Sequence, residues 1–376
     1  MKDSKNSLVL SGGGSRGGYE IGVWKALREL NFPIHIVTGA SVGAINGGMI
    51  VQNTFDESVA LWQELETHMV FDIDVDEDRT KEQSAKKRLN GFDFEVGGMS
   101  PVEALAYARE IVTKGGAGSS GLKDLLDKYI DEKLIRESPI EFGIVTVEFP
   151  SMKPHYLFKE DIPHGKMKDY ILASASCFPA VQPTTIQGKK YIDGGYADVM
   201  PIEMAMNKGA DNIVGVNLDA AGFVRKNTIK EAQEHASKLI IIESHWNLGN
   251  FLIFDKNNTH RIIQLGYLNT MKAFHRYDGD AFTFEKGAFP EKTLRKAEAA
   301  AKIFGVDPLK VYSVETLNQA LIPKIRKTLS AQGLTVRIAK DLALHSGGSI
   351  FLNKHFLRLF RTEVLAAAYI LHARLI

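Results

Sequence analysis

Two glycine-rich turns in the first fifty residues constrain the fold of this chain more than any other feature. The apolar runs at 8–10 and 34–38 each lead directly into such a turn, and the segments 19–30 and 44–52 that follow have the apolar spacing of helices. A strand, turn and helix that repeat in this way are typical of a βαβα start, in which the strands lie parallel. The sequence therefore predicts an α/β fold with a largely parallel central sheet flanked by helices.

The alternation of strands and helices stops near residue 220, which predicts a chain in two parts. We expect an α/β domain over 7–218 and a mostly helical C-terminal region over 219–376. Within the second part, the segments 228–277 and 291–376 have mainly helical spacing.

The composition excludes several classes of function. The 376 residues carry a net charge of +1, so no overall positive field attracts nucleic acid. Cys177 is the only cysteine, which excludes a disulfide framework and favours a reducing compartment. There is no apolar run of about 18 residues and no apolar run of signal-peptide type before the fold. We therefore expect a cytoplasmic protein without a transmembrane helix.

Metal and cofactor motifs are missing from the sequence as well. The acidic run 72–78 resembles the start of a calcium-binding loop, but Glu77 stands where that loop requires glycine and Gln83 where it requires a bidentate glutamate. We expect a solvated acidic loop there, and neither a metal nor a cofactor in the protein.

The second glycine-rich turn contains a candidate nucleophile. Ser41 lies in a G-x-S-x-G pattern between Gly39 and Gly43, after a predicted strand and before a predicted helix. A serine on such a sharp turn projects its hydroxyl above the sheet, near the positive end of the helix. By itself, the pattern is equally consistent with a serine that only caps the helix.

The first glycine-rich turn is a candidate anion site, formed by Gly12, Gly13, Gly14, Arg16 and Gly17. Consecutive glycines leave backbone N–H groups accessible, and such a nest stabilises an oxyanion. The same glycines fit the dinucleotide fingerprint G-x-G-x-x-G, but the next strand ends without the acidic residue that holds the ribose. We expect Arg16 to anchor the loop by bonding carbonyl groups, with direct substrate contact as the alternative.

A third turn supplies a candidate base. Asp193 ends a predicted strand and is followed by Gly194 and Gly195. On its own, this pattern is that of an ordinary β-turn. Because open α/β sheets bind ligands at the carboxyl ends of their strands, the three turns together favour one site that contains Ser41 and Asp193.

The three turns in this order resemble the patatin-like phospholipases. That family has a G-G-G-x-R-G loop, then a G-x-S-x-G elbow, and later D-G-G or D-G-A. The resemblance covers about residues 7–218, including the apolar loop 173–183 and the Pro201-Ile202 pair. Residues 260–277 look like what bacterial members carry after the core.

The resemblance implies a patatin-like, three-layer fold and a serine–aspartate dyad. Ser41 would attack an acyl carbonyl, Asp193 would take its proton, and N–H groups near Gly13 and Gly14 would hold the oxyanion. Water would then hydrolyse the acyl-enzyme. An unperturbed aspartate, with a pKa of about 3.9, is a poor base at neutral pH, so burial or a neighbouring dipole has to raise the pKa.

Three functional interpretations remain open from the sequence. The first is a lipid acyl hydrolase that acts on phospholipid or lysophospholipid, with peripheral membrane contact. The second is a non-catalytic lipid- or nucleotide-binding module, and the third is an esterase for small soluble esters. A Ser–His–Asp triad is disfavoured because only one strand–helix unit precedes Ser41 and none of the histidines lies in a distinctive motif.

Two further features have a structural and a functional interpretation. The basic amphipathic tail from Ile350 is suited either to a membrane surface or to packing on the core or on another subunit, which leaves a homo-oligomer open. Cys177, in the apolar loop near the expected site, is interpreted as a small packing residue instead of a nucleophile.

Overall fold

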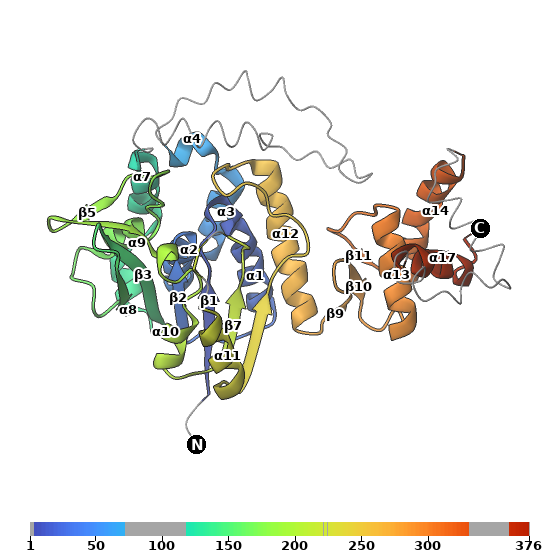
Figure 1. Cartoon of the computed structure of the whole chain (residues 1–376), viewed down its shortest axis with the longest axis horizontal. Helices are drawn as coiled ribbons and strands as arrows, with labels where there is room; N and C mark the ends of the chain where they lie inside the picture. Colours follow the sequence, from blue (N-terminus) through green and yellow to red (C-terminus); the bar gives the residue numbers. More distant parts are fainter. Residues whose placement is uncertain (1–3, 72–117, 221, 224, 331–360, 376) are drawn as a thin grey trace. The chain divides into compact units, whose positions relative to one another are not determined.

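The computed structural model describes residues 4–71, 118–220, 222–223, 225–330 and 361–375. Contacts divide the chain into two compact units, with the division along the C-terminal half falling after Thr270 (Figure 1). The expected acidic loop at 72–78 and residues 350–360 of the amphipathic tail lie outside the described residues.

Five parallel strands form the centre of the sheet in the first unit. In spatial order they are β3 (Glu141–Phe149), β2 (Ile36–Ala40), β1 (Lys5–Leu10), β7 (Ala210–Val216) and β8 (Lys238–Ile242). Three further strands pair antiparallel at the β3 side, namely β4 (Lys153–Phe158), β5 (Thr184–Ile186) and β6 (Lys189–Asp193). The prediction of a largely parallel sheet is confirmed.

Helices cover both faces of this sheet. Ile36 packs with Ile202 of α10 (Ile202–Asn207), whereas its neighbour Val37 lies against Gly47 of α2 (Val42–Val51). Because successive side chains of a strand point to opposite faces, α10 and α2 lie on opposite sides of the sheet. The predicted three-layer arrangement is therefore confirmed.

The remaining helical elements of the first unit complete the two outer layers (Figure 1). They are η1 (Gly14–Gly17), α1 (Gly18–Glu29), α3 (Phe55–Glu64), α4 (Thr67–Val70), α7 (Ser120–Tyr129), α8 (Glu132–Glu137), α9 (Met167–Ser174), η2 (Gly194–Tyr196), α11 (Lys226–His235) and α12 (Lys256–Ala273).

The first unit extends further than the segment 7–218 expected from the sequence. The segment 228–277 was expected to be mainly helical, but β8 lies within it and pairs in parallel with β7. The run Lys238–Ile242 is short and apolar, and helical and strand periodicities are hard to tell apart in such a run. Since β8 belongs to the sheet and most of α12 to the same unit, the compact unit continues to Thr270.

In its described residues, the second unit combines three helices with a small sheet. Its helices are α13 (Glu291–Ile303), α14 (Val314–Ser330) and α17 (Arg361–His372), and its strands are β9 (Tyr277–Asp278), β10 (Thr283–Glu285) and β11 (Val311–Tyr312). Phe284 of β10 packs against the rings of Phe289 and Tyr312, and Phe289 packs against Tyr369 of α17. The C-terminal part is thus helical, as predicted, with short strands in addition.

The described helices of both units are too short or too polar to span a membrane.

Candidate active site

Ser41 occupies the turn between β2 and α2 in a strained backbone conformation. Its φ is 55° and its ψ is −129°, a combination that residues with side chains rarely adopt. Its side chain makes no capping hydrogen bond to the helix, so the interpretation of Ser41 as a simple helix cap is wrong. The residue instead has the geometry of a nucleophile elbow.

The two flanking glycines are required by the close approach of strand and helix at this turn. A Cβ atom on Gly39 would lie 2.3 Å from the carbonyl oxygen of Gly43. A Cβ atom on Gly43 would lie 2.4 Å from the carbonyl oxygen of Leu10. Because both obstacles are backbone atoms, no side-chain rearrangement could relieve them, and this explains the G-x-S-x-G spacing.

Ser174, at the end of α9, supports the elbow from the side. The backbone N–H of Ser41 donates to Ser174 Oγ at 3.0 Å, and that hydroxyl donates to the carbonyl oxygen of Val145 at 2.6 Å. Ser174 is completely buried. The sequence analysis missed this role, because nothing in the order of residues shows that α9 ends beside the elbow.

The register of β3 explains why Asp193 lies beside Ser41. The last residue of β2, Ala40, pairs with Val145, and the last residue of β6, Asp193, pairs with the adjacent Thr146. Since β4 covers one edge of β3 along this stretch, β2 and β6 must share the other edge. Their carboxyl ends therefore meet head to head, and this meeting brings the two predicted site residues together.

Burial of Asp193 changes the chemistry of its carboxyl group. Only 5% of the residue is exposed, and Oδ1 accepts a hydrogen bond from the Gly195 amide at 2.7 Å. Burial raises the pKa of Asp193 to about 6, against the hydrogen bonds from Ser41 and Gly195, which lower it. The difficulty of an aspartate base at neutral pH is thereby reduced, because the carboxylate is a stronger base than a free one.

The glycine loop lies against the same turn. A Cβ atom on Gly12 would lie 3.1 Å from Cβ of Ser41, and the Gly12 N–H already donates to the carbonyl oxygen of Val199 at 3.0 Å. Gly14 has a φ of +56°, and a Cβ atom there would lie 2.0 Å from the carbonyl oxygen of Phe251. The loop can follow this path only with glycine at position 14.

Arg16 anchors the glycine loop, as predicted. Its Nε donates to the carbonyl oxygen of Gly249 at 2.9 Å, and its Nη1 donates to that of Leu218 at 3.0 Å and to that of Asp219. The guanidinium group therefore ties two later loops to the glycine loop.

A largely apolar cavity of about 610 Å³ opens at the serine–aspartate pair. Among the described residues that line it are Ser41, Asp193, the three glycines of the first turn, and many apolar side chains: Val42, Ile45, Met49, Leu61, Trp62, Leu65, Val70, Phe71, Leu122, Leu125, Leu126, Phe178, Val181, Val199, Leu252 and Phe254. No histidine is among the described lining residues, which disfavours a triad at this site.

Cys177 also lines the cavity without the properties of a nucleophile. Burial raises the pKa of its thiol to about 12, helped by the nearby charge of Asp193. The thiolate is therefore disfavoured at neutral pH, in agreement with the interpretation of Cys177 as a packing residue.

A buried polar network lies behind the glycine loop and the elbow helix. Asn46 of α2 donates to Glu20 Oε2 at 2.8 Å and to the carbonyl oxygen of Gly17 at 3.1 Å, and it accepts from Trp62 Nε1 at 2.9 Å. Glu20 is fully buried, and its Oε1 has no hydrogen-bond partner among the described residues. Burial raises the pKa of Glu20 to about 8, so it is mainly protonated at neutral pH.

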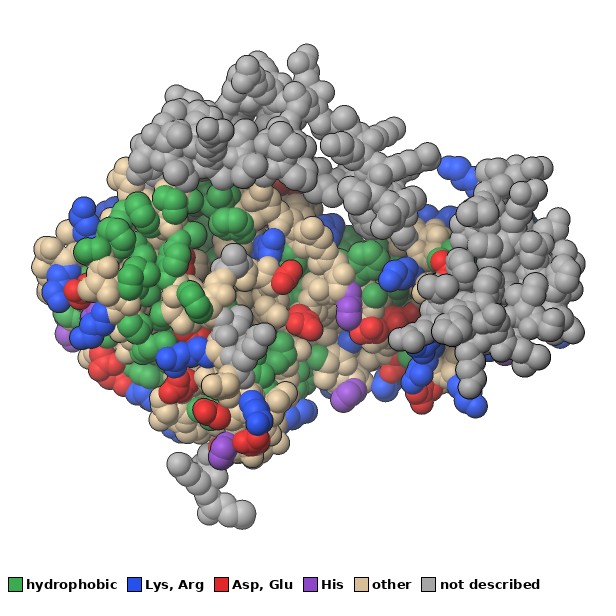
Figure 2. Space-filling view, viewed as in Figure 1, with side chains coloured by type: hydrophobic (Ala, Val, Ile, Leu, Met, Phe, Trp, Pro, Cys, Tyr) green, Lys and Arg blue, Asp and Glu red, His purple; other side chains and the backbone are tan. Residues whose placement is uncertain are grey.

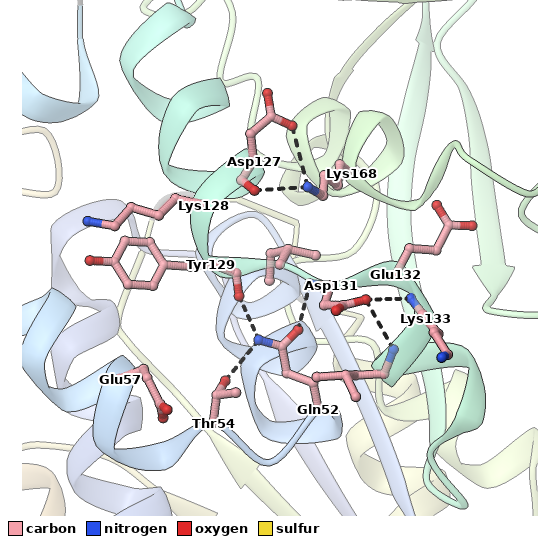
Figure 3. Close-up of a pocket in the computed structure, with 12 residues that line it drawn as sticks. Gln52, Thr54, Glu57, Asp127, Lys128, Tyr129, Asp131, Glu132, Lys133 and Lys168 are labelled. Carbon is pink, nitrogen blue, oxygen red and sulfur yellow. Dashed lines mark hydrogen bonds and ion pairs between the residues drawn. The ribbon is translucent and has the colours of Figure 1, made fainter.

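A second cavity, of about 580 Å³, is polar and shares no lining residue with the first (Figure 3). Gln52 bridges its wall, since its amide donates to Thr54 Oγ1 and to the carbonyl oxygen of Tyr129 and accepts from the Asp131 amide. Its charged groups also pair with one another, as Lys168 does with Asp127 (Figure 3). We therefore interpret the polar residues that line the second cavity as structural, because many of them bond to one another.

Comparison with known families identifies the family to which the chain belongs. The family model described as patatin-like phospholipase matches residues 8–206, which is more than half of the chain. The chain belongs to the patatin-like phospholipase family. The match includes the glycine loop, the elbow and the acidic turn, and the resemblance noted in the sequence is confirmed.

In individual relatives, the region that matches this chain is only a small part of the whole protein. A lysophospholipase of Aspergillus terreus is 27% identical over 241 residues, which make up 64% of this chain and 13% of that protein. A patatin-like phospholipase domain-containing protein of Caenorhabditis elegans is 26% identical over 215 residues, again 13% of its length. Among solved structures, VipD from Legionella pneumophila aligns with 99% of this chain and 88% of its own, at 15% identity and a TM-score of 0.41.

Proposed function

We propose that this patatin-like protein hydrolyses carboxylic esters of lipids, with Ser41 as nucleophile and Asp193 as base. The observation that carries the proposal is the strained Ser41 beside a buried carboxylate at the opening of an apolar cavity. The family and the lysophospholipase relatives support phospholipid or lysophospholipid as the substrate class.

The proposed reaction has two halves that both use Asp193. The Ser41 hydroxyl proton passes to the Asp193 carboxylate while Oγ attacks the acyl carbonyl carbon, and the protonated Asp193 then protonates the departing alcohol. Water attacks the acyl-enzyme in the second half, loses a proton to Asp193, and releases the fatty acid as Ser41 is restored.

The oxyanion is assigned to the backbone N–H groups of Gly13 and Gly14. Gly12 is a poorer candidate because its N–H is bonded to Val199. A donor aimed at the developing charge typically contributes about 3 kcal/mol to the barrier reduction. Arg16 would act on these donors only indirectly, by holding the loop in place.

The apolar cavity would take the acyl chain. Its volume lies in the range of pockets that enclose a drug-sized ligand, and most of its lining is aliphatic or aromatic. Transfer of a hydrocarbon chain from water into such a lining is favourable by about 0.8 kcal/mol per methylene group. This term favours lipid esters over short soluble esters.

Fatty acid release from micellar lysophosphatidylcholine tests the proposal. We expect Ser41→Ala and Asp193→Asn to lower turnover by at least about 10³-fold, while Ser151→Ala, a change of an exposed serine on the β3–β4 turn, leaves it unchanged. Normal turnover by Ser41→Ala would refute the mechanism. A higher rate on a soluble short-chain ester than on micelles would favour the esterase alternative.

A further inference from the structure

Two of the exposed aromatic side chains lie at the opening of the apolar cavity. In the described part of the chain, six large hydrophobic residues are exposed: Leu134, Met152, Phe223, Phe251, Val314 and Leu371. Phe223 is 68% exposed and Phe251 is 38% exposed, and both also line the cavity. Single exposed hydrophobic residues are common, but two aromatic rings at one cavity opening form a distinct apolar feature.

Each of these two phenylalanines is fixed to one of the catalytic turns by backbone hydrogen bonds. The Phe223 N–H donates to the carbonyl oxygen of Gly195 at 3.0 Å, and its carbonyl accepts from the Val199 amide at 2.9 Å. The carbonyl oxygen of Phe251 accepts from the Ser15 amide in the glycine loop at 2.8 Å. The two rings are thus presented to solvent from positions that the active-site backbone holds in place.

The apolar surface continues from these rings to the neighbouring loop. Pro179 is exposed and Phe178 half-buried, and both line the same cavity. Figure 2 shows apolar side chains gathered on the face that carries α7 and α9. An acyl chain that moves from a lipid aggregate into the cavity at this point passes from one hydrocarbon environment to another and is little exposed to water.

Two charged pairs among the described residues lie near the loops that carry Phe223 and Phe251. Arg225 is paired with Glu203, and the charge of Asp219 lies near that of Arg16. Because these two described pairs are neutral overall, we assign the binding free energy to the apolar contact.

We propose that Phe223 and Phe251 insert into a lipid–water interface and thereby place the cavity opening against a zwitterionic lipid surface. The proposal rests on the lipid substrate class proposed above, and it goes further by assigning the residues that contact the aggregate. Rim aromatics suit this role because their rings are apolar and stiff.

Cosedimentation with phosphatidylcholine vesicles tests the proposal, with the full chain in a Ser41→Ala background so that no lipid is consumed. We expect Phe223→Ser/Phe251→Ser to lower the partition coefficient by at least about tenfold. The matched control, Leu134→Ser/Met152→Ser, changes two exposed hydrophobic residues that do not line the apolar cavity, and it should bind as Ser41→Ala alone does. Equal binding by the two double variants, or no binding by Ser41→Ala alone, would overturn the proposal.

A fluorescence measurement distinguishes the loss of a membrane contact from a loss of binding that is caused by misfolding. Phe223→Trp keeps a large apolar ring at the rim, so it should still bind, and its added emission should shift to shorter wavelength with vesicles. Met152→Trp should show no such shift. The same absence of a shift in Phe223→Trp would contradict insertion. Because neither measurement uses turnover, a failure here is distinguishable from a failure of the serine mechanism.

Discussion

Burial of the Asp193 carboxyl group predicts how the rate of the proposed reaction depends on pH. The carboxylate has to be ionised to accept the Ser41 proton, and burial raises its pKa to about 6. We therefore expect kcat/KM to be constant above about pH 7 and to fall about tenfold per unit as the pH drops below 6. Initial rates on a soluble ester between pH 4.5 and 8.5 would measure this limb, and a rate that stays constant down to pH 4.5 would contradict the assignment.

Glu20 is expected to titrate as a buried acid that the fold keeps protonated. Its pKa is raised by burial from 4.5 to about 8. As the pH rises through this window, the unfolded chain releases the proton first, so the free energy of unfolding of the wild type falls. Glu20→Gln cannot ionise, and its stability relative to wild type should rise from about pH 4.5 to 8, by a few kcal/mol in all.

Denaturant unfolding of Glu20→Gln and wild type at pH 5, 7 and 8.5 would measure this difference. Glu57→Gln, on an exposed position of α3, is the control for replacing a glutamate outside the buried network. A difference for Glu20→Gln that does not change with pH would show that Glu20 is ionised in the folded protein throughout.

The proposed site residues could be selected from the sequence, but their environment could not. Ser41 and Asp193 stand in local patterns whose turn chemistry requires glycines beside them, so a short stretch of sequence identifies them. The raised pKa of Asp193 depends on burial by residues far apart in the chain. The support from Ser174 likewise depends on where α9 ends in space.

The strand that ends at Asp193 was expected from the sequence, but its antiparallel pairing with β3 was not. Glycine-flanked turns and parallel strands were predicted from periodicity, because those signals are local. The meeting of β2 with β6 on one edge of β3 is a register property of three strands, and β2 (Ile36–Ala40) and β6 (Lys189–Asp193) lie far apart in the sequence. The edge strand β8 was missed for the related reason that its short apolar run has no decisive period.

The elbow between β2 and α2 should tolerate no side chain at its second glycine. Gly43→Ala places a Cβ atom 2.4 Å from the carbonyl oxygen of Leu10, so strand and helix must separate. We expect a loss of about 2–4 kcal/mol in the free energy of unfolding, together with loss of turnover. Gly48→Ala in the same helix is the matched control, since its Cβ would meet only side-chain ends of Ile130, Ile171 and Ile135.

Chemical denaturation of both alanine variants would measure how much each substitution changes the free energy of unfolding. Gly48→Ala should change stability by less than about 1 kcal/mol, because alanine also favours the helix. Equal stability of Gly43→Ala and wild type would mean that the close approach of α2 to the end of β1 is not required.

At the level of the whole chain, the residues proposed to act in catalysis all lie in the first compact unit. All strands of the large sheet, the cavity and the three glycine-rich turns fall before Thr270. The family match likewise ends at residue 206. The second unit has its own aromatic core around Phe284, and neither the family match nor the site assigns it a role in the reaction.

Covalent labelling of the whole protein by a fluorophosphonate, followed by intact-mass measurement, tests the central claim most directly. Such a reagent reacts with a serine only when the hydroxyl is activated, as Asp193 and the glycine loop are proposed to activate Ser41. We expect one adduct on wild type and none on folded Ser41→Ala. An adduct on Ser41→Ala as well, or none on folded wild type, would contradict the assignment of Ser41 as the nucleophile.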